Sequence, residues 1–168
     1  ADDRVFGPYP IGFVFGYYGA GYDELYVGTN GFLSFLPSQS HGCCSGRRLP
    51  DSRNPNGIIA AYWEDFDLRR GGSLKYQTLG AAPNRRFILQ WTDVQHQRRN
   101  DRPVTMQIVL YERSNDVELR YVSALSDGGN HSTGLENTRG NDGLTIRYGN
   151  YNLVNTAFRI TAPPQESA

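Results

Sequence analysis

The chain has 168 residues and a formal net charge of zero, with 17 basic and 17 acidic side chains. This balance argues against a nucleic-acid-binding protein or any general polyanion binder, because such binding depends on a net or clustered basic charge. The length fits a single domain with a substantial core. The lack of any run of eighteen apolar residues predicts that no helix inserts into a membrane.

Glycine, proline and aromatic residues are abundant. The counts of 19 Gly, 9 Pro, 11 Tyr and 8 Phe, without long runs of helix-forming residues, are typical of an all-β protein. Large apolar residues alternate with small ones from residue 11 onward, and a second extended segment is predicted over residues 22–27. Asn30-Gly31 favours a tight turn because both residues tolerate positive φ, and residues 32–36 form the next predicted strand.

Residues 57–63 are apolar at both odd and even positions, which predicts a strand that is buried on both sides or lies under a loop. Turns rich in glycine, asparagine and proline separate it from further segments with a period of two residues. These predicted strands cover residues 73–79, 85–94, 104–111, 117–121, 132–136, 144–148 and 157–161.

About eleven short strands, with turns between them and no period of 3.6 residues, predict an antiparallel β-sandwich with little or no helix. A closed barrel is the less favoured alternative. We expect one domain over residues 1–161, followed by a proline-containing tail or linker over residues 162–168.

The only two cysteines, Cys43 and Cys44, are neighbours in a loop rich in glycine, arginine and proline. Neither has an intrachain disulfide partner except the other. From the residues alone, four arrangements remain: a vicinal disulfide, an intermolecular bridge, a thiolate pair on a metal or cofactor, or two free thiols. A vicinal disulfide closes almost no loop and so stabilises the fold little. We therefore expect it to shape a local surface instead.

Two acids at the end of the apolar strand raise the question of a metal. Asp65 and Asp67 have the same parity, and carboxylates that converge with loop carbonyls are what a Ca²⁺ site requires. The competing interpretation is that these acids are solvated or paired with the nearby Arg69 and Arg70. No other cofactor is indicated.

Signals for catalysis are weak. A glycoside hydrolase needs two carboxylates roughly 5 to 10 Å apart across a cleft, and the candidates are Glu64, Glu118 and Glu136. The chain has no nucleophile elbow, P-loop or dinucleotide fingerprint. Its histidines show no spacing typical of metal ligands, and they are His41, His96 and His131. The sequence therefore favours a non-catalytic protein.

Tyrosines gather at predicted turns and strand ends, where a ring can stack on a sugar or a partner protein while its hydroxyl stays in water. The alternative is ordinary cross-strand packing. The tyrosines at such positions are Tyr17, Tyr18, Tyr22, Tyr62, Tyr148 and Tyr151. Of these, we expect Tyr17, Tyr18 and Tyr62 to contribute to a binding surface.

Several segments together resemble the nidogen-like (NIDO) domain family and its bacterial relatives in secreted proteins. The most specific are Asn30-Gly31-Phe32-Leu33-Ser34-Phe35 and the strand Ile58-Ile59-Ala60-Ala61-Tyr62-Trp63-Glu64-Asp65. Further matching segments lie at residues 11–15, 71–76, 87–91, 105–111 and 134–137. The resemblance covers residues 8–149 and implies an extracellular β-rich module associated with adhesion, without established catalytic residues. The adjacent cysteine pair is not part of the animal pattern.

Combined with the resemblance, these patterns predict a secreted module that binds a glycan or an extracellular protein. The alternative is a structural subunit that self-associates through exposed strand edges. Two adjacent thiols would not persist in an oxidising compartment, so we predict a Cys43–Cys44 disulfide in the binding surface, as an apolar platform for a sugar ring. Arg47 and Arg48 would then donate hydrogen bonds to the ligand.

Overall fold

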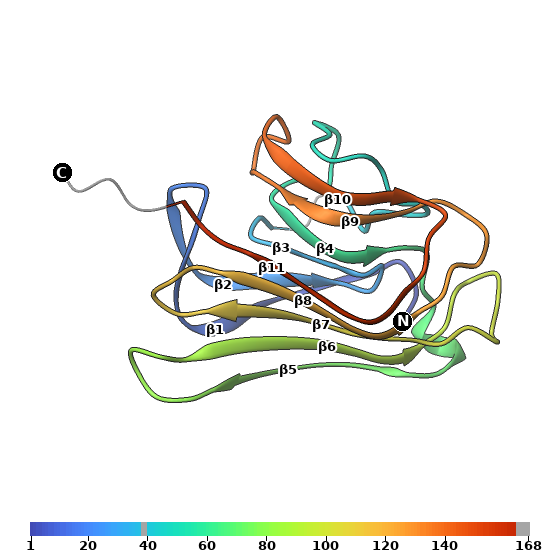
Figure 1. Ribbon diagram of the computed structural model, residues 1–168, viewed down its shortest axis with the longest axis horizontal. Coiled ribbons are helices and arrows are strands. Elements are labelled where there is room, and N and C mark those ends of the chain that lie inside the picture. Colours follow the sequence, from blue (N-terminus) through green and yellow to red (C-terminus); the bar gives the residue numbers. More distant parts are fainter. Residues whose placement is uncertain (38–39, 164–168) are drawn as a thin grey trace.

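The computed structural model describes residues 1–37 and 40–163. In these residues eleven strands form two antiparallel sheets, one of six strands in the order β1-β2-β3-β4-β9-β10 and one of five strands in the order β11-β8-β7-β6-β5. The two sheets stack face to face, as Figure 1 shows from the side. The predicted all-β sandwich is confirmed.

Every predicted strand is present. The strands are β1 (Val5–Tyr17), β2 (Ala20–Gly28), β3 (Phe32–Ser34), β4 (Ile58–Trp63), β5 (Ser73–Leu79), β6 (Arg86–Val94), β7 (Val104–Tyr111), β8 (Val117–Ala124), β9 (His131–Glu136), β10 (Gly143–Gly149) and β11 (Leu153–Ile160), with one 3-10 turn, η1 (Leu68–Arg70). None of the described helical residues forms a segment long and apolar enough to cross a membrane. The tail expected over residues 162–168 lies mostly outside the described residues.

Two strands begin more than two residues earlier than predicted, β1 by six residues and β11 by four. Both are edge strands, and one long side of an edge strand faces solvent, so its apolar alternation is weaker. β1 also contains Pro8 and Pro10. Proline is tolerated there because an edge strand has backbone N–H positions that need not bond to a neighbour.

The main core lies between the two sheets. Phe87, Leu89 and Trp91 alternate inward along β6, and Met106 and Ile108 do the same along β7. These are the residues that the period of two placed on one face. Because alternate side chains of a strand point to opposite faces, the prediction of which residues share one face also predicted which residues share the other.

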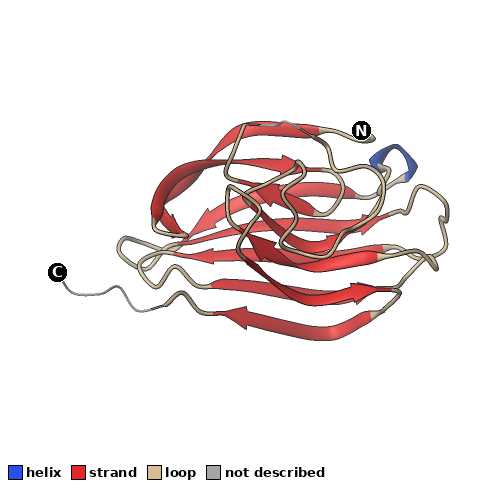
Figure 2. Ribbon diagram, turned by 90° about the horizontal axis from the view of Figure 1, so that it is seen from above, coloured by secondary structure: helices blue, strands red, loops and turns tan. Residues whose placement is uncertain are grey.

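A second, smaller core lies on the outer face of the six-stranded sheet. Ile58, Ala60 and Trp63 point outward from β4 and pack against Phe32 and against Leu49 of the loop 40–57. Seen from above in Figure 2, long loops cross the strands of the sandwich. β4 is thus buried on both sides and lies under a loop, as its unbroken apolar sequence predicted.

The predicted turn at Asn30 and Gly31 also shapes β4. The Gly31 carbonyl accepts hydrogen bonds from both Ala61 N (3.0 Å) and Tyr62 N (3.5 Å), and the pairing of β4 with β9 shifts register before Trp63. This bulge places Ala61 and Tyr62 together in the main core and turns Trp63 outward. A Cβ on Gly31 would stand 2.1 Å from the Tyr62 carbonyl oxygen, so the close approach requires glycine.

Candidate functional site

Cys43 and Cys44 form a disulfide with each other, and the peptide between them is cis. Both residues are exposed. The predicted vicinal disulfide is therefore confirmed, and with both sulfurs oxidised the thiolate metal site weighed from the sequence is not formed. The two residues present a sulfur surface to solvent at the end of the molecule where β4 terminates.

The loop that carries the disulfide is fixed to the sheet beneath it. Trp63 Nε1 donates a buried hydrogen bond of 2.8 Å to the Gly42 carbonyl. Farther along, Thr145 Oγ1 of β10 accepts from Leu49 N (2.8 Å) and donates to Leu49 O (2.6 Å). These contacts hold the loop at several points along the sheet, so the disulfide has a defined position relative to the sandwich.

The two predicted arginine donors have different roles. The Arg47 guanidinium lies 4.9 Å from the centre of the Trp63 ring, pairs with Asp51 at 3.3 Å and donates to the Asn54 carbonyl at 2.6 Å. Arg47 is thus engaged in holding the loop together. Arg48 is exposed, with its guanidinium 4.7 Å from the centre of the Tyr148 ring. No ion pair among the described residues involves Arg48, so its donors face solvent.

Two of the three predicted tyrosines are not at the surface. Tyr17 is buried with its hydroxyl within 3.0 Å of the carbonyls of Ile58 and Glu136. Tyr62 is fully buried and its hydroxyl donates to the Tyr151 carbonyl at 2.8 Å. Both rings belong to the main core, so the expectation that they stack on a ligand is wrong. Cross-strand packing was the correct alternative.

The third tyrosine, Tyr18, is exposed but lies elsewhere. Its ring contacts Tyr17, which is bound to Ile58 at the first residue of β4, whereas the disulfide lies beside Trp63 at the last residue. Six residues at about 3.3 Å each separate the two positions by roughly 15 to 20 Å. Tyr18 and the disulfide therefore do not form one surface.

The predicted pair of calcium ligands does not converge. Asp67 accepts from Arg69 Nε and Nη2 at 2.9 Å and caps η1, and its carboxylate lies 3.8 Å from Arg70. These arginines lower the pKa of Asp67, with hydrogen bonding to Arg69 as the main cause. Asp67 is a salt-bridged acid, which was the competing interpretation.

Asp65 instead lies beside the disulfide. Its carboxylate, the carboxylate of Asp3 and the sulfurs of Cys43 and Cys44 have atoms within 4.8 Å of one another. Burial, followed by the neighbouring negative charges of Asp3 and Asp2, raises the pKa of Asp65 to about 6. The result is an apolar sulfur surface next to two hydrogen-bond acceptors.

The glutamates weighed as a glycosidase pair lie far apart. Glu64 and Glu136 are at opposite ends of the paired strands β4 and β9, and Glu118 is in β8 of the other sheet. Glu136 is buried and accepts a hydrogen bond of 2.8 Å from Asp51 N, while its burial raises its pKa to about 7. No two of these three carboxylates face each other across a cleft.

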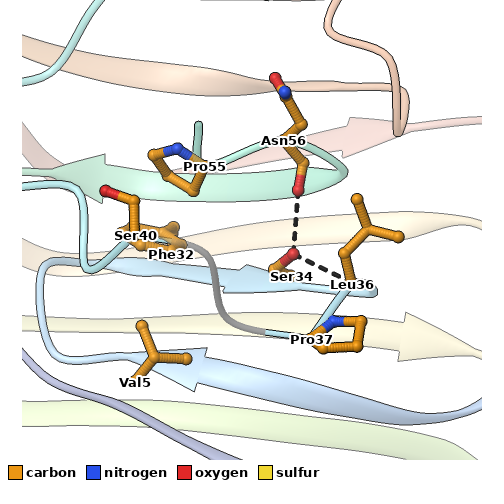
Figure 3. Close-up of a pocket in the computed structure, with 8 residues that line it drawn as sticks. All are labelled: Val5, Phe32, Ser34, Leu36, Pro37, Ser40, Pro55 and Asn56. Atoms are coloured by element: carbon orange, nitrogen blue, oxygen red, sulfur yellow. Dashed lines mark hydrogen bonds between the residues drawn. The ribbon is translucent and has the colours of Figure 1, made fainter. Parts of the chain in front are cut away.

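The hollow nearest the loop is small. It lies between the sheet residues Val5 and Phe32 and the loop residue Pro55, where Ser34 bonds to the Asn56 carbonyl (Figure 3). Its volume of about 10 Å³ is close to the space of one water molecule. The hollow is therefore too small to hold a sugar ring.

One group of buried polar residues was not predicted from the sequence. His96 and His131 looked unrelated along the chain, yet both lie fully buried beside Glu64 and close to Asp127. The four residues come from three segments that are far apart in the chain, namely the end of β4, the segment after β6 and residues 127–131, so no short spacing motif connects them. The turn expected between the predicted strands at 117–121 and 132–136 said nothing about the direction of the Asp127 side chain.

Comparison with known proteins gives a family match over almost the whole chain. The family model described as "NIDO related" matches residues 1–166. No solved structure matches the chain.

Proposed function

Because the chain belongs to the NIDO-related family, we propose that it is an extracellular, non-catalytic binding or adhesion module that recognises a glycan through the surface around Cys43 and Cys44. The resemblance of its strands to nidogen-like domains supports the extracellular assignment. A matrix or cell-surface protein that carries such a glycan would be the natural partner.

One observation carries the proposal: an exposed disulfide stands within 4.8 Å of two carboxylates, Asp3 and Asp65. A sugar has an apolar ring face and a rim of hydroxyl groups. The sulfurs offer an apolar surface to the ring, and ionised carboxylates accept hydrogen bonds from hydroxyls. Bonds to a charged acceptor are roughly twice as strong as those between neutral groups.

The loop also presents a cation. Arg48 is exposed and its guanidinium rests on Tyr148, so its planar fork is held in place before a ligand arrives. Such a group binds a carboxylate or a pair of ring oxygens in two parallel hydrogen bonds. An acidic sugar that spans the disulfide and Arg48 would use both features.

A glycan array followed by titration calorimetry on the best ligand tests the proposal. We expect Asp65→Asn, and the double variant Cys43→Ser with Cys44→Ser, to weaken binding at least about tenfold, equivalent to ~1.4 kcal/mol. Tyr18→Ala is the matched control, because Tyr18 is exposed at the other end of β4 and its loss should leave affinity unchanged. An array without any ligand, or affinity that depends on Tyr18 and not on Asp65, would contradict the proposal.

A second candidate function is self-association through a sheet edge. A groove of about 420 Å³ runs along the edge strand β5 and is lined by Phe6, Tyr9, Leu74 and Tyr76. Phe6 and Tyr76 are among the exposed large apolar residues. Exposed edges with apolar side chains pair readily with a strand of another chain. Size-exclusion chromatography with light scattering separates the two candidates, since a monomer at all concentrations removes this one.

A further inference from the structure

Four ionisable side chains are buried together beneath Asp65. The exposed fractions of the side chains are 5% for Glu64, 6% for Asp127 and 0% for His96 and His131. His96 is positioned because segment 65–67 bonds to segment 95–97, through Asp67 N to Gln95 O and Gln97 N to Asp65 O. Burying two carboxylates is costly unless positive charge is buried with them.

Both ring nitrogens of His131 face a polar neighbour. Ser126 Oγ accepts from Gly128 N (3.0 Å) and lies 2.7 Å from His131 Nε2. His131 Nδ1 lies against Glu64 Oε2, and a ring nitrogen that contacts a carboxylate oxygen carries a proton. The other oxygen of that carboxylate, Glu64 Oε1, accepts from Asp65 N. His131 and the Asp65 amide therefore orient the Glu64 carboxylate.

His96 is different, because one of its nitrogens has no hydrogen-bond partner. Nε2 lies 2.9 Å from the Leu125 carbonyl, which can only accept, so Nε2 carries the proton. In the neutral ring Nδ1 is then an acceptor. It is buried without a partner among the described residues, and it faces Glu64 Oε2 at 3.7 Å and Asp127 Oδ2 at 3.9 Å. A lone pair that faces two carboxylates is repelled, so either a second ring proton or a metal cation must lie between them.

We propose that Glu64, His96 and Asp127 bind a divalent transition metal ion, for which Zn²⁺ is the best match. Ligand atoms about 2.1 Å from a tetrahedral ion stand roughly 3.4 Å apart, close to the 3.7 Å and 3.9 Å that separate His96 Nδ1 from the two carboxylates. The two carboxylates supply the charge that a divalent ion neutralises. Imidazole as a ligand favours zinc over calcium or magnesium.

The surroundings match those of a metal-binding histidine. A histidine that binds a metal through one nitrogen usually donates its other N–H to a backbone carbonyl or a carboxylate, as His96 does to Leu125. His131 plays the corresponding part for Glu64, because its buried ring contacts the carboxylate at Oε2. The ion would connect the end of β4, the segment after β6 and the loop between β8 and β9.

The side chains of three residues also contact one another in the order of a hydroxyl, a base and an acid, and these residues are Ser126, His131 and Glu64. We do not assign catalysis to them. Ser126 is only 8% exposed and His131 is fully buried, and the Ser126 oxygen already accepts from Gly128 N. A substrate could not reach the hydroxyl without displacing the loop between β8 and β9.

Zinc binding to the purified, chelator-treated chain tests the proposal. We expect one equivalent of Zn²⁺ by competition with a chromophoric chelator, one equivalent of Co²⁺ with the visible absorption typical of four-coordinate sites, and a higher Tm with either ion. Asp127→Asn keeps the shape of the side chain and should weaken binding at least about 100-fold, more than the usual loss of a residue that only supports a ligand. His96→Gln should do the same.

His41→Gln is the matched control, since His41 is an exposed histidine next to the carboxylate of Asp3, and it should leave binding unchanged. Wild-type protein that binds neither Zn²⁺ nor Co²⁺ would overturn the proposal, and an NMR spectrum that shows His96 doubly protonated at neutral pH would then identify a proton in the place of the ion. Zinc binding that is lost with His41 and kept without His96 would overturn it as well.

Discussion

The hydrogen bond between Trp63 and Gly42 can be tested against an internal control. Trp63→Phe removes the indole N–H that donates to the buried Gly42 carbonyl at 2.8 Å. Leaving a buried acceptor without its partner costs about 1–3 kcal/mol. The other tryptophan, Trp91, is equally buried, but its Nε1 has no partner among the described residues. Trp91→Phe therefore loses ring volume without losing a hydrogen bond.

Since both variants lose the same ring atoms, the difference between them reports mainly the hydrogen bond, with a smaller contribution from the Arg47 guanidinium that lies 4.9 Å from the centre of the Trp63 ring. We expect the free energy of unfolding to fall by about 1–3 kcal/mol more in Trp63→Phe than in Trp91→Phe, measured by urea unfolding with circular dichroism. We also expect a phosphine reductant to open the Cys43–Cys44 disulfide faster in Trp63→Phe, because the loop loses its anchor beside the disulfide. Equal stabilities, or equal reduction rates, would refute this account of how the loop is held.

Three further predictions concern the turn and two carboxylates. Gly31→Ala should lower the free energy of unfolding in urea by more than ~3 kcal/mol, because the new Cβ would lie 2.1 Å from a backbone oxygen. Gly19→Ala is the control, since Gly19 has positive φ but nothing within 4 Å, and it should lower this free energy by only about 1 kcal/mol. Similar losses in the two variants would argue against the close approach at Gly31. The pKa of Glu136 is raised from 4.5 to about 7 in the folded chain, so the folded chain binds more protons in that range and stability should fall as pH rises through 7. Glu136→Gln should flatten this dependence in Tm measurements, and an unchanged slope would contradict the assignment. Under the proposed function, affinity for a sugar should decrease as pH falls through about 6, the pKa of Asp65, and an affinity that is constant from pH 5 to 8 would exclude its ionised form as the acceptor.

The β-sandwich could be predicted because the sequence patterns that indicate its strands and turns are local. Alternation along β6 and β7, and the Asn30-Gly31 turn, each depend on a few consecutive residues. The edge strands β1 and β11 were placed less accurately because solvent on one side removes the need for strict alternation. Cys44 is the only other cysteine in the chain and the neighbour of Cys43, and the predicted disulfide between the two is correct.

The parts of the site that could not be predicted depend on contacts between distant segments. Tyr62 lies in a strand buried on both faces, so parity could not show whether its ring faced a ligand or the core. The buried cluster joins Glu64 to His96 and Asp127 across separations of 32 and 63 positions in the chain. No periodicity extends over such distances, and only the register of the sheets brings these residues together.

The small core under the loop 40–57 has a consequence for how this surface can change during evolution. Leu49 and Gly42 face the sheet and are tied to Thr145 and Trp63, whereas the exposed disulfide and Arg48 touch few residues of the main core. Substitutions at the exposed positions therefore alter what the surface recognises at little cost to folding, since loops on a rigid scaffold tolerate variation. The fold thus uses separate sets of residues for stability and for specificity, and new specificities can arise on an unchanged sandwich.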